Sequence, residues 1–257
     1  MKKARHFVVG DIHGGYRALV QVLKKVNFDY EIDTLTSLGD LVDGWPESFE
    51  VVEELLKIKN LNKIRGNHDE VFREYLETGV NQMGWLHGGD STLRSYVNHA
   101  DREVKMWPEM GSWETTLTRA DIPKTHLAFF NEQVNYHIQD DNVFVHGGFD
   151  RHLPLEEQRA DFVYYWDRGL FKEAFADSRS IRKFKMKFQE KWIKKVFIGH
   201  SATTNYEITT PMFLDKIVNL DTACGYGYGR LTLMNVDTLE YVQSDKLKDL
   251  YPTDKGR

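Results

Sequence analysis

Five short segments share one pattern, in which an apolar stretch runs directly into glycine, aspartate, asparagine or histidine. They are VVGDIHG at 8–14, SLGDLVD at 37–43, IRGNHDE at 64–70, FVHGG at 144–148 and FIGHS at 197–201. In an open α/β sheet, functional side chains gather in a crevice beyond the carboxyl ends of the strands. We therefore expect six side chains to converge there: Asp11, His13, Asp40, Asn67, His146 and His200.

This set of side chains offers carboxylate, imidazole and amide donors but no thiolate. Such a mixture suits Mn²⁺, Fe or Zn²⁺ in a catalytic site and is unlike a structural cysteine–zinc site. Six donors exceed what one catalytic ion with open positions needs, but they suit two ions that share a carboxylate. Paired ions can clamp the attacking and leaving oxygens of an in-line displacement at phosphorus. The sequence therefore predicts a centre for two divalent ions, with Mn²⁺ preferred.

The spacing of these residues supports a common crevice. His13 to Asp40 and Asp40 to Asn67 are each 27 residues apart, about the length of one strand–helix–strand crossover. A single Gly-Asp after a strand is more often only a turn. The prediction therefore depends on all five segments occurring together in this order.

Apolar periodicity indicates which elements position the segments. Helical spacing over 16–26 and 46–59, with Pro46 suited to the first turn of the second helix, alternates with short strands and favours a largely parallel sheet. Residues 70–130 are mainly helical by pattern, with a helix after Pro123. The apolar runs predict these strands: 6–11, 33–40, 61–67, a hairpin at 134–148, 195–200, 216–221 and 230–236.

Composition is that of an ordinary globular chain of 257 residues, with 41% hydrophobic residues and a formal charge of −5. We expect a single domain over 1–257 with a polar, helical, basic excursion at about 151–195. The charge predicts no stable binding to nucleic acid and no membrane association. Cys224 is the only cysteine, and the apolar run near the start is too short for a secretory signal, so a cytoplasmic location is expected.

Taken together, the motifs resemble the calcineurin-like metallophosphoesterases, and within them the phosphoprotein phosphatase branch with its bacterial and phage serine/threonine phosphatases and diadenosine tetraphosphatases. The resemblance covers roughly residues 6–237. It includes three further segments: WLHGGDSTLRSY at 85–96, with His87 where the family has asparagine, YYWDRGL at 164–170 and LDTACGYGYGRLTL at 220–233. It implies an αββα sandwich of two mixed sheets flanked by helices.

The resemblance also implies roles for the metal donors. Asp11 and His13 would bind the first ion, and Asp40 would bridge both ions. The second ion would be completed by the remaining donors, Asn67, His146 and His200.

Catalytic roles follow from the same resemblance. A metal-bridging hydroxide would attack phosphorus, His68 would protonate the leaving group as general acid, and Asp43 would orient His68 and stabilise its imidazolium. Arg65 and Arg168 are candidates for binding the substrate phosphate. Asp69 would support the metal ligands from behind.

The second motif departs from the family pattern Gly-Asp-x-Val-Asp-Arg-Gly, because Gly44 and Trp45 stand where the family has Arg-Gly. Losing a charge-assisted contact to phosphate could cost about 1.5–3 kcal/mol. Either Arg168, Arg65 or another cation compensates, or the pocket prefers a phosphodiester or nucleotide with Trp45 as a stacking face. Alternatively, Trp45 only packs under the following helix.

These observations leave three functions open. The first is a phosphomonoesterase of the protein serine/threonine or tyrosine phosphatase type, acting on phosphorylated proteins or small phosphoesters. The second is hydrolysis of dinucleoside polyphosphates or phosphodiesters, and the third is binding of phospho-ligands without catalysis.

The basic run RSIRKFKMKFQEKWIKK at 179–195 has apolar residues at helical spacing. It predicts an amphipathic helix with a solvated face, or a positive rim that steers phosphorylated substrates inward.

Overall fold

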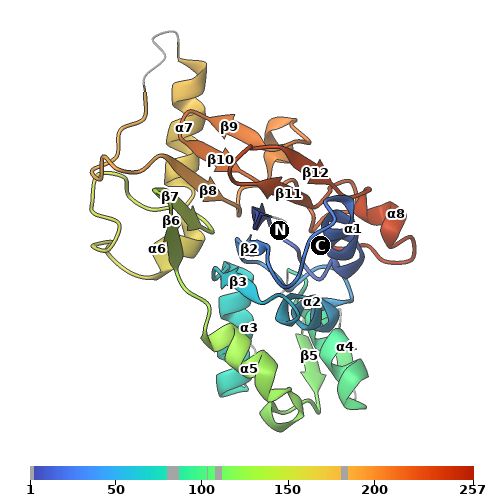
Figure 1. Cartoon of the computed structure of the whole chain (residues 1–257). Helices are drawn as coiled ribbons and strands as arrows, with labels where there is room; N and C mark the ends of the chain where they lie inside the picture. The colour runs from blue at the N-terminus through green and yellow to red at the C-terminus, as the bar shows by residue number, and fades with distance from the viewer. Residues whose placement is uncertain (1–2, 80–86, 103, 108–111, 181–184) are drawn as a thin grey trace.

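Two five-stranded mixed sheets lie face to face in the computed structural model, which describes residues 3–79, 87–102, 104–107, 112–180 and 185–257 (Figure 1). The first sheet runs in the order β12 (Tyr241–Gln243), β11 (Thr232–Asn235), β1 (His6–Val9), β2 (Thr34–Ser37) and β3 (Asn60–Lys63). The second runs in the order β6 (Tyr136–Gln139), β7 (Asn142–Val145), β8 (Lys195–Ile198), β10 (Ile217–Asn219) and β9 (Met212–Leu214).

Both sheets combine parallel and antiparallel pairs. In the first, β1 is parallel to β2 with Val9 opposite Ser37, and antiparallel to β11 with Val9 opposite Leu233. In the second, β7 and β10 are both parallel to β8, and the outer strands β6 and β9 are antiparallel to their neighbours. Parallel neighbours need crossovers, and α1 (Tyr16–Lys25) and α2 (Ser48–Leu56) supply those of the first sheet.

Helices flank the two sheets on their outer sides. One buried apolar cluster joins the first sheet to α1, α2, α3 (Asn67–Thr78), α4 (Gly89–Ala100), α5 (Lys124–Asn131) and α8 (Leu247–Leu250). A second joins the other sheet to α6 (Phe162–Trp166) and α7 (Gly169–Arg179). Smaller elements are the hairpin β4 (Val104–Trp107) and β5 (Ser112–Thr115) and the 3₁₀ turns Arg119–Asp121 and Thr203–Tyr206. The predicted αββα sandwich is confirmed.

A third apolar cluster fills the space between the sheets. Val8 and Met234 from the first sheet meet Phe144 and Phe197 from the second. The rings of these two phenylalanines stack with centroids 5.0 Å apart. Because both faces of each sheet are covered, the central strands read as continuous apolar runs, as they do in the sequence.

The helix predicted over 179–195 is wrong, and two other elements differ in detail from the prediction. Helix α7 ends at Arg179, and residues 185–194 form neither helix nor strand, whereas a helix is predicted over 179–195; residues 181–184 lie outside the described ranges. Met186 and Phe188 are buried while Lys185 and Lys187 are exposed, so the chain alternates with the period of an extended segment. The mainly helical region at 70–130 also contains the hairpin β4–β5, and α2 begins at Ser48 rather than beside Pro46.

Within the described ranges, no helix combines the length and apolar character needed to cross a membrane.

His6 in β1 should make stability depend on pH. Its ring is buried against Phe144, and its Nε2 lies 2.8 Å from the Thr36 hydroxyl. Burial, followed by the charge of His137, lowers the pKa of His6 from 6.5 to about 4. Between these values the unfolded chain takes up a proton that the folded chain does not, so stability falls as pH falls.

We expect His6 to account for a loss of up to about 2 kcal/mol in the free energy of unfolding between pH 7 and pH 5. Urea denaturation of the wild type and of His6→Gln at both pH values measures it. The glutamine can keep the bond to Thr36 but does not titrate, so the variant should lose less stability. An equal loss in both proteins would contradict the prediction.

Candidate metal centre and substrate cavity

Two groups of potential metal ligands meet at Asp40. Asp11, His13 and Asp40 form one group, and Asp40, His146 and His200 form the other, with the donor atoms of each group within 4.8 Å of one another. All five side chains are buried. Asn67 places its Oδ1 3.2 Å from His146 Nε2, so all six predicted donors lie together.

Each donor lies just beyond the carboxyl end of a strand. Asp11 and Asp40 follow β1 and β2 of the first sheet, and Asn67 begins α3 after β3. His146 and His200 follow β7 and β8 of the second sheet. The centre therefore spans the seam between the two sheets, and each sheet supplies part of it.

Several of these residues have an unusual backbone conformation. His13, Asp40, Asp43 and His200 have φ values of 50°, 50°, 68° and 63°, in the left-handed region that residues other than glycine seldom adopt. Such conformations persist where the surroundings enforce them and cluster at functional sites. Position 66 accommodates only glycine, because a Cβ there would overlap the backbone and carboxylate of Asp40.

Backbone groups fix the orientation of the donors. Nδ1 of His13 lies 3.0 Å from the Val42 carbonyl and Nδ1 of His146 lies 2.8 Å from the Leu38 carbonyl, so in each ring Nδ1–H donates and Nε2 faces the centre. The His200 amide donates to Asp11 at 3.0 Å, and the His68 amide donates to Asp40 at 2.9 Å. Contacts of this kind orient metal ligands from behind.

The electrostatics of the centre favour cations. Burial, followed by the charge of Asp221, holds the pKa of Asp11 well above its usual range, and burial also raises the pKa of Asp221. Burial opposes ionisation of Asp40, but His146 and His68 outweigh it and hold the pKa of Asp40 well below its usual range.

Burial and the neighbouring carboxylates also change the pKa values of the histidines. Burial would lower the pKa of His146, but Asp40 and Asp11 outweigh it and raise that pKa to about 9. Burial holds the pKa of both His13 and His200 well below the usual range, which keeps them neutral and able to act as ligands. Three buried carboxylates facing mostly neutral imidazoles fit two divalent cations, which would supply the missing positive charge.

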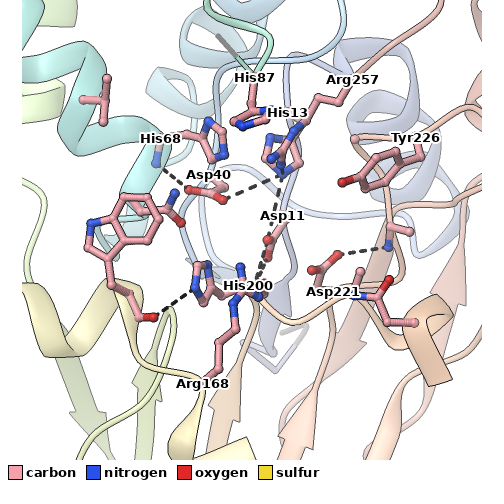
Figure 2. A pocket seen from close by; sticks show the side chains of 17 residues that line it. Asp11, His13, Asp40, His68, His87, Arg168, His200, Asp221, Tyr226 and Arg257 are labelled. Carbon is pink, nitrogen blue, oxygen red and sulfur yellow. Dashed lines mark hydrogen bonds and ion pairs between the residues drawn. The ribbon is translucent and has the colours of Figure 1, made fainter. Parts of the chain in front are cut away.

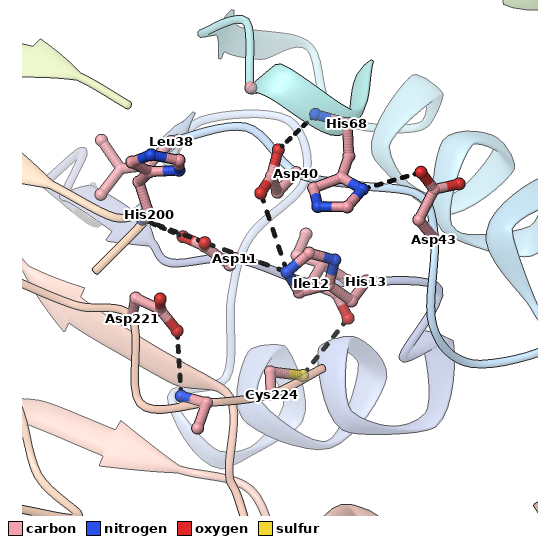
Figure 3. Close-up of polar contacts among 12 residues, drawn as sticks. Asp11, Ile12, His13, Leu38, Asp40, Asp43, His68, His200, Asp221 and Cys224 are labelled. Atoms are coloured by element: carbon pink, nitrogen blue, oxygen red, sulfur yellow. Dashed lines mark hydrogen bonds and ion pairs between the residues drawn. The ribbon is translucent and has the colours of Figure 1, made fainter. Parts of the chain in front are cut away.

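A histidine–aspartate pair stands beside the centre (Figure 3). His68 Nδ1 lies 2.7 Å from Asp43 Oδ2, and the Thr92 hydroxyl donates to Asp43 Oδ1 at 2.7 Å. The ring of His68 meets that of His13 edge-on with centroids 5.2 Å apart. His68 is thereby held in one orientation next to the first group of donors, and its Nε2 is left for another partner.

Asp69 lies behind the centre, as the resemblance implies. It accepts hydrogen bonds from the Leu41 amide at 2.8 Å, the Gly66 amide at 3.1 Å and Gln133 Nε2 at 2.9 Å. Burial, followed by the charge of Asp40, raises the pKa of Asp69 to about 6. These bonds join the loop of Asp40 to the start of α3.

A cavity of about 340 Å³ opens onto the donors (Figure 2). The two predicted phosphate-binding arginines are placed differently around it. Arg168 lines the cavity, and its Nη1 donates to the His200 carbonyl. Arg65 is absent from the described lining, donates to the Gln133 carbonyl at 2.9 Å and lies 3.4 Å from Glu70.

Ten further lining residues had no predicted role, among them His87, Trp166, Asp221, Tyr226 and Arg257. Asp221 follows β10, so the strand-end pattern that identified the other donors could have identified it as well. The resemblance placed His87 and Asp221 in family segments without assigning them chemistry. Nothing in the sequence signalled Arg257.

Trp45 is fully buried and cannot offer a stacking face to a ligand. Its Nε1 donates to the Cys224 carbonyl at 2.7 Å, and its ring stacks on Tyr251 at 4.9 Å. Trp45 is therefore a packing residue, as one of the sequence alternatives proposed. That alternative placed it under the following helix, whereas its aromatic partner is Tyr251.

The fold and the paired donor groups define a class of metal-dependent hydrolases of phosphoric esters. The model of the calcineurin-like phosphoesterase family matches residues 4–216, and the chain belongs to that family. Calcineurin-like phosphoesterases use a dinuclear metal centre, and the two donor groups that share Asp40 are the residues that could hold it here.

Relatives of the chain carry several activities in their names. The chain is 27% identical to the asymmetrical bis(5'-nucleosyl)-tetraphosphatase PrpE of Anoxybacillus flavithermus, over 91% of each protein. It is 28% identical to a symmetrical bis(5'-nucleosyl)-tetraphosphatase of Pseudomonas putida, over 95% of this chain and 93% of that one. It is 42% identical to serine/threonine-protein phosphatase 2 of Escherichia coli, but over 34% of this chain and 39% of that one.

Among solved structures, a putative diadenosine tetraphosphatase matches with a TM-score of 0.62 and 19% identity, over 94% of this chain and 93% of that chain. This likeness supports the fold.

Asp40 should be required for binding of two metal ions. We expect calorimetric titration of the metal-free wild type with Mn²⁺ to show two sites, and Asp40→Asn to weaken binding by at least about 10-fold, because it removes the one charge common to both groups. The amide can still accept the bond from the His68 amide, so the fold should persist. Asp237→Asn, at an exposed aspartate, is the matched control. Binding of two ions to Asp40→Asn with wild-type affinity would refute the assignment.

Proposed function

We propose that the protein hydrolyses dinucleoside polyphosphates at a centre of two divalent ions, with Mn²⁺ as the preferred metal. The observation that carries the hydrolytic part is the sharing of Asp40 by two buried donor groups beside the His68–Asp43 pair. Two bound ions would supply an activated nucleophile and neutralise charge on the phosphoryl group. The donors in this proposal are the six that the sequence predicts, with Asp221 as a buried carboxylate beside them.

In this proposal His68 is the general acid. The bond between its Nδ1 and Asp43 leaves Nε2 as the atom that can give a proton to the leaving oxygen. As the oxygen of water forms its bond to phosphorus and the bond to the leaving oxygen breaks, that proton neutralises the departing group. The Asp43 carboxylate stabilises the imidazolium form that must precede the transfer.

Two observations favour a nucleotide substrate over a phosphoprotein. Two relatives that match over nine-tenths of both proteins are named as tetraphosphatases, whereas the matched protein phosphatase covers about a third of this chain. The cavity is also lined by Trp166, whose side chain is 50% exposed, and by Tyr226. Aromatic faces beside a phosphate site suit the bases of a nucleotide.

A protein serine/threonine phosphatase is the second candidate. It is supported by the 42% identity over 87 residues to the Escherichia coli protein phosphatase. The two candidates share the centre and the chemistry, and they differ in what the rim of the cavity binds.

We expect kcat/KM in Mn²⁺ to be higher for diadenosine tetraphosphate than for p-nitrophenyl phosphate, bis(p-nitrophenyl) phosphate or a phosphoserine peptide. Chromatography of nucleotide products and release of p-nitrophenol or phosphate measure the four rates. A preference for the peptide would favour the second candidate and contradict the first.

His68→Ala should lower kcat by about 10²- to 10⁴-fold if His68 is the general acid. The loss should be larger with phenyl phosphate than with p-nitrophenyl phosphate, because phenolate is the poorer leaving group and needs the proton more. His99→Ala, at an exposed histidine of α4, is the control. An equal loss with both esters would indicate that His68 has a structural role instead.

A further inference from the structure

In the second motif, Gly44 lies beside His13 at the position where the family has arginine. Gly44 has no side chain, and a Cβ there would lie 2.9 Å from the His13 carbonyl oxygen and 3.4 Å from Cγ of Arg257. The space that a side chain at position 44 would enter is therefore already bordered by an arginine from a distant part of the sequence. An arginine side chain from residue 257 therefore runs beside the position at which the family motif carries its arginine.

Trp45, which together with Gly44 stands where the family has Arg-Gly, holds the segment 251–257 in place. Tyr251 stacks on Trp45, and its hydroxyl accepts a hydrogen bond from the Arg17 amide at 3.0 Å. At Gly256, with φ of 70°, a Cβ would lie 2.7 Å from Cζ2 of Trp45, so the backbone can pass over the indole only as glycine. The Arg257 amide then donates to the Gly225 carbonyl at 2.9 Å. Trp45 thus supports the segment that carries Arg257.

The side chain of Arg257 points into the cavity (Figure 2). Its Nη1 lies 3.0 Å from Nε2 of His13, and its guanidinium lies 5.7 Å from the ring centre of Tyr226. Its Nε is buried and has no hydrogen-bond partner among the described residues. Arg168 reaches the centre from the opposite side, next to His200.

The contact with His13 indicates what Arg257 is free to bind. His13 Nδ1 is engaged with the Val42 carbonyl, so Nε2 is the atom that accepts from Arg257 and also the atom available to a metal ion. A metal at Nε2 would leave Nη1 without this acceptor while Nε already lacks one. The planar fork of an arginine matches the oxygens of a phosphoryl group.

We propose that Arg257 binds the substrate phosphoryl group, in place of the arginine that position 44 lacks. The inference rests on the proposed function in taking a phosphoryl substrate, and it holds for either substrate candidate. Its ligand is a tetrahedral oxyanion bound at the loaded metal centre between Arg257 and Arg168.

Calorimetric titration of the Mn²⁺-loaded protein with inorganic phosphate tests this proposal. We expect Arg257→Ala to raise the Kd for phosphate by about 10- to 100-fold, the effect of losing one charge-assisted contact, and Arg257→Lys to give an intermediate value. Lys255→Ala removes an exposed charge from the same segment and should change Kd by less than about twofold. Mn²⁺ affinity measured without phosphate should not fall in Arg257→Ala, since the change removes a cation near the ligands.

Either of two results with Arg257→Ala would overturn the proposal. One is phosphate binding as tight as that of the wild type, and the other is a loss of Mn²⁺ affinity as large as its loss of phosphate affinity. Absence of phosphate binding to the loaded wild type would do the same. Thermal unfolding of both variants checks that the segment 251–257 stays docked. Because the measurement needs no turnover, weaker phosphate binding in a protein that does not cleave diadenosine tetraphosphate would reject that substrate and still support Arg257.

Discussion

Buried negative charge at the meeting point of the two sheets is the constraint on which the rest of the structure depends. Asp11, Asp40 and Asp221 are 3%, 2% and 6% exposed, and carboxylates this far from water are costly unless cations or hydrogen-bond donors face them. The chain meets part of that cost with backbone amides and with His146, whose pKa rises to about 9. The part of this cost that is not offset favours binding of metal ions. The buried carboxylates therefore destabilise the metal-free fold and at the same time create affinity for metal.

The need to place donors from both sheets explains why the site and the core cannot be separated. Asp11 and Asp40 come from the first sheet, and His146 and His200 come from the second. Their relative positions depend on the layer in which Val8 and Met234 of the first sheet pack against Phe144 and Phe197 of the second, because that layer lies between the sheets. Close packing resists small displacements. The apolar contacts between the sheets therefore help to fix the distance across the metal centre.

Features of the fold and the site were predictable from the sequence where a short stretch of residues determines them. The six donors predicted from the strand-end pattern lie together, because the pattern requires only a short apolar run followed by a polar residue, and the same rule would have included Asp221. The helix predicted over 179–195 is wrong because apolar residues at helical spacing coexist there with the alternation of Met186 and Phe188, and burial in the second core selected the latter. The position of Arg257 depends on contacts across more than 200 residues, such as Trp45 with Tyr251, which no local pattern encodes.

The exchange of Arg-Gly for Gly44-Trp45 is best understood as one coordinated change. A phosphate site needs a guanidinium close to the phosphate oxygens, but that guanidinium can come from different segments of the chain. Moving that group to residue 257 goes with glycine at 44, where a Cβ would lie 2.9 Å from the His13 carbonyl oxygen and 3.4 Å from Cγ of Arg257, and it requires an anchor that keeps the segment 251–257 over the cavity. Trp45 is that anchor through its ring and its bond to the Cys224 carbonyl, so it acts as a positioning residue without touching the substrate. On this view the two altered residues are coupled: replacing Trp45 would weaken phosphate binding by releasing the segment 251–257, whereas a side chain at position 44 would also press on His13.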